Sequence, residues 1–112
     1  MIEIKDLIDK VIQFRDDRDW QQFHNAKDLA LSLSLEASEL LELFQWKTSE
    51  EAVEQNLEKM KDELADIVTY ALLFANETGI DITSAVNEKL EKNDKKYPVE
   101  KAYGVSKKYT EL

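Results

Sequence analysis

Two pairs of acidic residues have the spacing and surroundings of a chemical site. Glu36 and Glu39 form one pair, and Glu63 and Asp66 form the other. Residues three apart are neighbours on the surface of a helix, so each pair can direct two carboxylates toward a common point. Grouped carboxylates can bind a hard divalent cation or exchange protons with a reacting group. The pattern therefore predicts a metal site or an acid–base site.

Two long helices must position these acids. Apolar spacing predicts one helix over residues 26–46 and another over residues 49–78. Glu36 lies in the middle of the first helix's apolar stripe and Glu39 at its edge; the stripe consists of Leu29, Leu33, Leu40, Leu43 and Phe44. Glu63 lies within the second stripe, with Asp66 beside it; that stripe consists of Met60, Ile67, Tyr70, Ala71 and Phe74. We expect the acids to face the interface between helices.

Carboxylates at such positions need compensation, because burying an unpaired charge costs several kcal/mol. Protonation, a basic partner such as Lys59, or a divalent cation could supply it. Oxygen ligands, with no cysteine and one histidine, favour Mg²⁺ or Mn²⁺ over Zn²⁺. A di-iron bundle would need Glu-x-x-His motifs, which the lone His24 does not provide. The spacing also allows a second interpretation, an acid-lined polar contact between helices or subunits.

The remaining chain predicts two more helices, over residues 2–18 and from Asp81 or Thr83 to about Lys96. Asn25 is a candidate N-cap, Thr48 and Glu51 fit a capping box, and Gly79 is a typical helix stop. Pro98 prevents the fourth helix from continuing. Few turn-forming residues are present, with 2 Gly and 1 Pro. We expect an all-α protein, a four-helix bundle-type single domain over residues 1–112 with residues 97–112 as a tail.

Charge and composition exclude several classes of function. The formal net charge of −9 repels phosphate backbones, so a nucleic-acid partner is not expected. The absence of cysteine excludes disulfides and thiolate chemistry. No apolar run approaches the ~20 residues of a membrane span, and no signal-peptide pattern is present. We expect a cytoplasmic protein with no membrane partner.

The acid pairs and their flanking segments resemble a known family. Glu36-Ala-Ser-Glu39 and Glu63-Leu-Ala-Asp66 are similar to the ExxE and ExxD motifs of the all-α, MazG-like nucleoside triphosphate pyrophosphohydrolases. The segments RDWQQFHNAKDL, DELADIVTYAL, KNDKKYP and SKKYTEL resemble the dCTP pyrophosphatase branch. The resemblance implies Mg²⁺-dependent hydrolysis of nucleoside triphosphates to the monophosphate and pyrophosphate, with Mn²⁺ a possible substitute. The four acids would be metal ligands and catalytic residues, with Glu39 the favoured water-activating base.

The resemblance also implies contacts with the nucleotide. Lys89, Asn93 and Lys96 would form a phosphate-binding stripe, although spacing alone favours an ordinary solvated face. Trp20 and Trp46 resemble the aromatic residues that stack on the base or line the pocket in this family, and Tyr70 is a further candidate. The alternative role of these three residues is packing in the core. Lys47 would contact the nucleotide or simply end a helix. His24 is expected to form a local hydrogen bond near the start of the helix at residue 26.

One departure concerns the base. Val11 lies where the dCTP branch can have a base-contacting histidine, and an apolar side chain cannot hydrogen-bond a base. The resemblance further implies a homodimer or homotetramer, and the apolar Leu72 and Leu73, outside the stripe around Glu63, favour coverage by another chain. The alternative function is a catalytically silent, helical oligomerisation or regulatory module that binds nucleotide or metal.

Overall fold

The computed structural model describes residues 3–112 and is helical throughout its regular elements. The chain forms two compact units: one extends to Gly79, and the second is Ile80–Leu112. The described residues contain no β-strand, so the predicted all-α class is confirmed. Among residues 3–112, no helix has both the length and the apolar character needed to cross a membrane.

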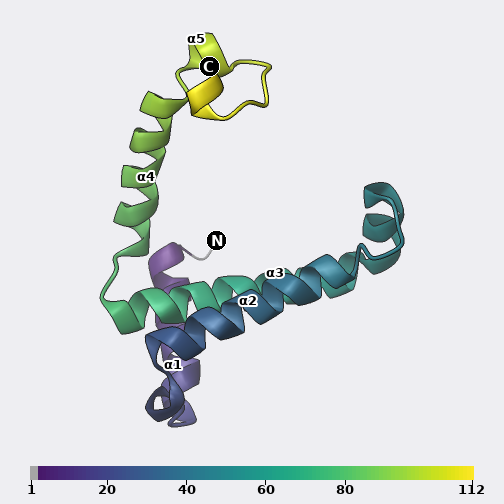
Figure 1. Cartoon of the computed structure of the whole chain (residues 1–112). Helices are drawn as coiled ribbons and strands as arrows, with labels where there is room; N and C mark the ends of the chain where they lie inside the picture. Colours follow the sequence, from purple (N-terminus) through teal and green to yellow (C-terminus); the bar gives the residue numbers. More distant parts are fainter. Residues whose placement is uncertain (1–2) are drawn as a thin grey trace. The chain divides into compact units, whose positions relative to one another are not determined.

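The first unit consists of three α-helices and one short 3₁₀ turn. Its helices are α1 (Ile4–Asp17), α2 (Ala26–Glu42) and α3 (Ser49–Thr78), and η1 (Gln21–Phe23) lies between the first two. Helix α2 packs along α3 as a hairpin, and α1 crosses α3 near the end away from the α2–α3 connection (Figure 1). The predicted start of the first helix at Ile2 lies outside the described residues.

Local signals set the helix ends as expected. The Asn25 side chain accepts a hydrogen bond from the Asp28 amide, at the start of α2. Thr48 and Glu51 form the complete capping box at the start of α3. Gly79 ends that helix in the left-handed conformation, with φ of 72°. These caps satisfy amides and carbonyls that have no partner inside the helix.

Helix α2 is shorter than predicted, because it ends at Glu42 and not at Trp46. Residues 43–46 instead form tight turns, in which the amides of Leu43, Phe44 and Gln45 donate to carbonyls three residues earlier. Trp46 has a positive φ of 64°. Asn56 explains part of this difference. It interrupts α3 with non-helical backbone angles, and its side-chain amide donates to the Leu43 carbonyl at 3.2 Å. This long-range hydrogen bond gives a partner to a carbonyl at the end of α2. Helical periodicity in the sequence cannot predict such a bond.

The core of the first unit lies where α1 and α2 pack against α3. Its most buried apolar side chains are Leu29, Ala52, Met60, Leu72, Leu73 and Ala75. Leu72 and Leu73 are therefore buried within one chain, and the expectation that they need a partner chain is wrong. Both line pockets that they share with α1, next to Val11. The crossing of α1 over α3 provides the cover that helical spacing alone does not reveal.

The second unit contains α4 (Ile82–Lys96), α5 (Val99–Ala102) and the 3₁₀ turn η2 (Tyr109–Glu111). Asp81 caps α4 by accepting a hydrogen bond from the Ser84 amide. The predicted tail is thus partly structured. Tyr109 packs edge-to-face against Tyr97 at 6.1 Å, and the Lys96 ammonium lies 4.9 Å from the centre of the Tyr109 ring.

Candidate functional site: a carboxylate cluster and an aromatic pocket

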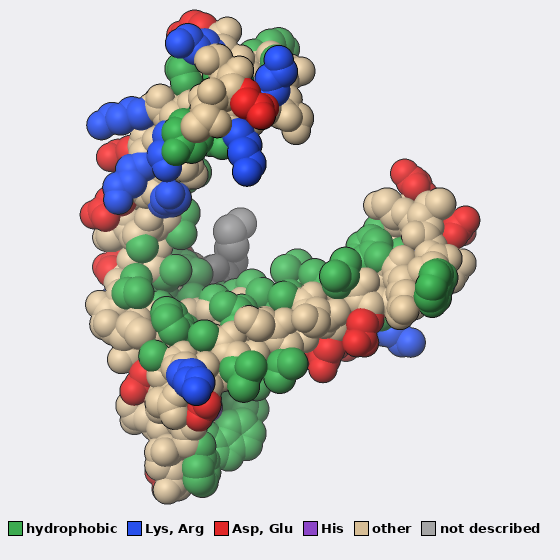
Figure 2. All heavy atoms as spheres, in the orientation of Figure 1, with side chains coloured by type: hydrophobic (Ala, Val, Ile, Leu, Met, Phe, Trp, Pro, Cys, Tyr) green, Lys and Arg blue, Asp and Glu red, His purple; other side chains and the backbone are tan. Residues whose placement is uncertain are grey.

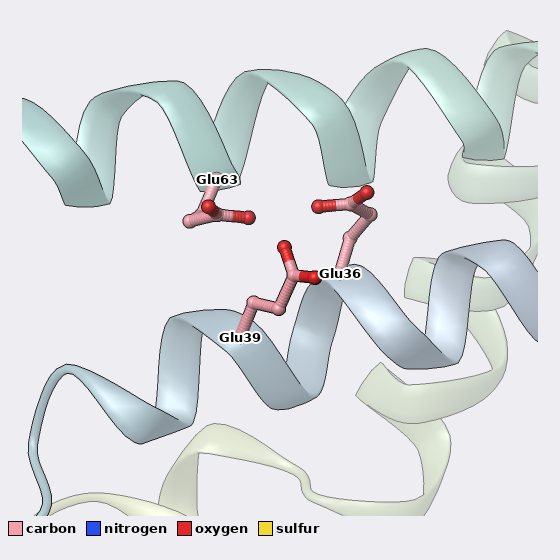
Figure 3. Close-up of side chains that lie close together, drawn as sticks. All are labelled: Glu36, Glu39 and Glu63. Carbon is pink, nitrogen blue, oxygen red and sulfur yellow. The ribbon is translucent and has the colours of Figure 1, made fainter.

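Three of the four predicted acids converge between α2 and α3. Carboxylate oxygens of Glu36, Glu39 and Glu63 all lie within 4.8 Å of one another. Figure 3 shows Glu36 and Glu39 extending from α2 toward Glu63 on α3. Glu36 and Glu63 are half-buried, whereas Glu39 is exposed. The cluster thus has two sheltered carboxylates and one that solvent reaches.

Each of the two sheltered carboxylates has an oxygen without a hydrogen-bond partner in the protein. The Oε2 atoms of Glu36 and Glu63 are both buried and have no hydrogen-bond partner. Buried polar atoms in folded proteins are nearly always paired, so two orphaned oxygens at one point need a physical explanation. A proton or a cation can provide the missing partner. The donor set of three carboxylates is suited to a hard divalent ion.

Mutual repulsion and hydrogen bonding alter the acidity of the cluster. A hydrogen bond to Glu63, then burial, then the neighbouring acids Glu39 and Asp66, raise the pKa of Glu36 to about 7. For Glu63, the hydrogen bond with Glu36 acts to lower the pKa, but burial and the charges of Glu39 and Asp66 raise it overall. In the absence of a cation, both carboxyl groups are therefore harder to ionise than an ordinary glutamate.

Asp66 occupies a different place from the three glutamates. Its charge influences both Glu36 and Glu63, so it lies near the cluster. Its side chain lines an adjoining pocket of about 440 Å³ between α1, η1 and α3. The pocket wall includes Phe14, Trp20 and Tyr70, and its other lining residues are Lys10, Val11, Arg15, His24, Thr69 and Leu73. Asp66 thus connects the carboxylate cluster to an aromatic pocket.

The two predicted tryptophans are in different environments. Trp20 lines the pocket, and its ring packs edge-to-face against Phe14 at 5.8 Å. Trp46 lies in the α2–α3 connection and is 92% exposed, so a role in its own chain's core is excluded. The α2–α3 connection lies beside Asn56, whose side chain binds the Leu43 carbonyl. Tyr70, which lines the pocket, is 14 residues farther along α3, a distance of about 21 Å along a helix. Within one chain, Trp46 does not reach the aromatic pocket.

The predicted lysines and the asparagine lie in two separate parts of the chain. Lys47 is exposed beside Trp46. Lys89, Asn93 and Lys96 lie on α4 in the second unit, where Lys89 and Lys96 are exposed and Asn93 is half-buried. The Lys96 ammonium contacts the Tyr109 ring, a partner in the C-terminal segment that the helical pattern does not indicate.

Sequence reasoning gave no role to Arg15, and it expected a different environment for His24, which also lines the pocket. Arg15 is only 4% exposed and donates to the Asn76 side chain at 2.8 Å and to Asp16. Its spacing from Ile8, Val11 and Ile12 could have placed it on the buried face of the first helix. For His24, the expected local bond of the side chain is not formed at Nδ1, which is buried without a partner. No sequence signal distinguishes that arrangement from a satisfied histidine.

The chain is similar to known proteins over most of its length. A family model described as MazG-like matches residues 31–112. The chain belongs to the MazG-like family. Human dCTP pyrophosphatase 1 is 39% identical to this MazG-like chain over 105 residues, which cover 89% of the chain and 62% of the human protein. The mouse protein of the same name is 37% identical with the same coverage, so the chain spans about 62% of the length of these relatives.

A solved structure supports the fold of this MazG-like chain. A pyrophosphatase from Archaeoglobus fulgidus DSM 4304 superposes with a TM-score of 0.80 at 38% identity. The match covers 88% of this chain and 94% of the archaeal chain. The all-α architecture is therefore that of the MazG-like family.

Proposed function

We propose that this MazG-like chain hydrolyses nucleoside triphosphates to the monophosphate and pyrophosphate, and that it prefers dCTP or a related pyrimidine nucleotide. The observation that carries the proposal is the convergence of Glu36, Glu39 and Glu63 around two orphaned buried oxygens. Relatives named as dCTP pyrophosphatases support the reaction class and the base. An enzyme of this kind would remove unwanted nucleotides from the cellular pool.

The cluster fits a divalent cation, Mg²⁺ by preference and Mn²⁺ as a substitute. Glu36, Glu39 and Glu63 would hold it, with Asp66 completing the set from the pocket side. The fit depends on the donor chemistry: hard carboxylate oxygens, two of them buried without a partner. Such an ion would neutralise phosphate charge and lower the pKa of a bound water.

Other side chains of the protein would activate the water and bind the nucleotide. Glu39 is the exposed member of the cluster, so its carboxylate is placed to orient a water and to accept its proton. Trp20 and Tyr70 would hold the base against an aromatic wall next to Asp66. Lys89, Asn93 and Lys96 would contact the triphosphate, as would Lys47. A net charge of −9 makes the metal-complexed nucleotide the favourable substrate.

We further propose that the chain acts as a homodimer or homotetramer in which Trp46 serves a neighbouring chain. Apolar side chains remain exposed along the α2–α3 hairpin (Figure 2), among them Leu31 and Leu35 on α2 and Leu57, Leu64 and Val68 on α3. Burial of such a surface would stabilise an assembly. Because Trp46 does not reach its own chain's pocket, a nucleotide contact by this residue requires a second copy.

Light scattering tests the assembly. The wild-type chain should be a dimer or tetramer at micromolar concentration, and Leu64→Glu should shift it toward monomer. As a control, Glu77→Lys alters charge at an exposed position on the same helix and should leave the mass unchanged. A wild-type monomer would contradict the proposed assembly.

A product assay tests the reaction. The protein is incubated with each common dNTP and NTP in Mg²⁺ or in EDTA, and the products are separated by anion-exchange chromatography. We expect monophosphate and pyrophosphate, loss of both in EDTA and in Glu36→Gln, and the highest rate with dCTP. Diphosphate plus phosphate would contradict the assigned reaction. No turnover with any nucleotide would favour the silent binding module instead.

A further inference from the structure

The connection between α2 and α3 departs from regular backbone geometry at an exposed aromatic residue. The Lys47 amide donates to the Phe44 carbonyl at 3.1 Å, so Trp46 is the third residue of a hydrogen-bonded turn. Its φ of 64° lies in the left-handed region, where glycine or asparagine is usual and a bulky residue is strained. The chain therefore keeps a strained tryptophan whose side chain is almost fully exposed to solvent.

A second departure from regular geometry lies at Asn56 in α3. Its φ of −125° and ψ of 20° are not helical, and the turns of α3 before this residue run in a different direction from those after it (Figure 1). Helix α3 contains no proline or glycine, the usual causes of a kink. The half-buried side chain of Asn56 instead leaves the helical pattern to donate a hydrogen bond outside its own helix.

That hydrogen bond joins the two irregular sites. Asn56 Nδ2 donates to the carbonyl of Leu43, the C-cap of α2, at 3.2 Å, and Leu43 lies three residues before Trp46. The capping box of Thr48 and Glu51 holds the connection on the other side, two residues after Trp46. The backbone that carries Trp46 is therefore attached to α3 at both ends.

A structural role for Asn56 alone does not explain this arrangement. Water commonly satisfies carbonyls at helix ends, so a partner for Leu43 does not require a kinked helix. Strained backbone persists where the surrounding structure enforces it, and it is concentrated at binding and catalytic sites. Trp46 does not reach the aromatic pocket of its own chain, so the feature that the strain serves is its outward projection.

We propose that Asn56 is a positioning residue, which holds the α2–α3 connection so that Trp46 projects against the nucleotide bound by a neighbouring chain. This inference rests on the proposed function and the proposed assembly. A side chain that packs on a base, away from the reacting phosphates, stabilises the bound substrate and the transition state equally. Loss of its correct position should raise KM and leave kcat nearly unchanged.

A double-mutant cycle between Asn56 and Trp46 tests this role. Asn56→Ala removes one neutral hydrogen bond, so we expect KM for dCTP to rise about 3- to 10-fold and kcat to stay within about two-fold. In the Trp46→Ala background, the same replacement should change KM by less than about two-fold. An equal rise in KM in both backgrounds would overturn the proposal, because Asn56 would then act independently of Trp46.

Two matched variants separate the hydrogen bond from other effects. Asn56→Asp keeps the size of the side chain but cannot donate to a carbonyl, so it should behave as Asn56→Ala. Gln55→Ala removes the neighbouring amide at an exposed position of α3 and should behave as wild type. All these variants should retain the wild-type mass in light scattering. Dissociation of Asn56→Ala would overturn the proposal, because the loss would then arise from assembly.

Fluorine NMR of protein labelled with 5-fluorotryptophan provides a readout that does not depend on activity. The Trp46 signal is assigned by its loss in Trp46→Phe. In Asn56→Ala without nucleotide, this signal should shift while the Trp20 signal stays in place. If wild type turns over no nucleotide, the proposed function fails separately, and this spectrum still decides whether Asn56 positions Trp46. A Trp46 signal that Asn56→Ala leaves unchanged would refute the positioning role.

Discussion

Replacing Glu63 with glutamine is expected to lower the pKa of Glu36 in the metal-free protein. Hydrogen bonding to Glu63 is the largest cause that raises the pKa of Glu36 to about 7. A glutamine cannot share that proton as a carboxylate does, and its amide can donate to ionised Glu36 and so stabilise the charged form. The pKa of Glu36 should therefore fall from about 7 toward 4.5.

The number of protons released when a metal ion binds follows from the fraction of Glu36 that is protonated beforehand. With a pKa of about 7, Glu36 is about half protonated at pH 7, about nine-tenths at pH 6 and about one-tenth at pH 8. A cation requires the ionised carboxylate. Binding of Mn²⁺ to wild type should thus release about half a proton from Glu36 at pH 7, more at pH 6 and little at pH 8. Glu63, with its own raised pKa, adds to the release.

Carbon-13 NMR of the side-chain carboxyl groups gives the pKa values directly in EDTA, and calorimetry in buffers of different ionisation enthalpy gives the proton release of wild type. Glu54→Gln is the matched control, because it makes the same change at an exposed position on α3 and should leave Glu36 titrating near 7. A pKa of Glu36 that stays near 7 in Glu63→Gln would refute the coupling. Proton release that does not decline between pH 6 and pH 8 would refute the assignment of the titrating group.

Three further predictions concern stability and the second unit. The pKa of Glu36 in the folded state exceeds its ordinary value of 4.5, so the folded state binds more protons than the unfolded state. The contribution of Glu36 to stability in EDTA should therefore be complete below pH 4.5 and be lost as the pH rises through 7. Thermal melting in EDTA should show this decline, Mg²⁺ should reverse it at pH 7.5, and a flat profile would contradict it. Because the Lys96 ammonium lies 4.9 Å from the Tyr109 ring, Tyr109→Leu should weaken pyrophosphate binding about two- to five-fold, as expected for an exposed cation–π contact. Tyr109→Phe keeps the ring and should bind as wild type in calorimetry; equal losses in both variants would argue against the contact. Gly79→Ala should destabilise the fold by about 1 kcal/mol, because φ is 72° while the space around an added Cβ is open; an unchanged denaturation midpoint would show that strain is absent.

Much of the fold could be predicted from local patterns. Asn25, Thr48, Glu51 and Gly79 determine helix ends through hydrogen bonds and backbone preferences that act within a few residues. Helical periodicity also places Glu36 and Glu63 on apolar stripes. The end of α2 was predicted four residues too late, because the Asn56 amide that binds the Leu43 carbonyl is 13 residues away. Periodicity contains no information about a partner at that distance.

The sequence by itself determined the all-α class, the caps and the two acid pairs, because these depend on residue type and on spacing within one helix. Only the tertiary structure decided that Glu36, Glu39 and Glu63 meet while Asp66 turns to a pocket. It also decided that His24 Nδ1 is buried without a partner and that Trp46 is exposed away from its own pocket. The physical reason is the same in each case: these properties depend on how α1 crosses α3 and how α2 packs along α3, and helix crossing is set by side chains far apart in the chain.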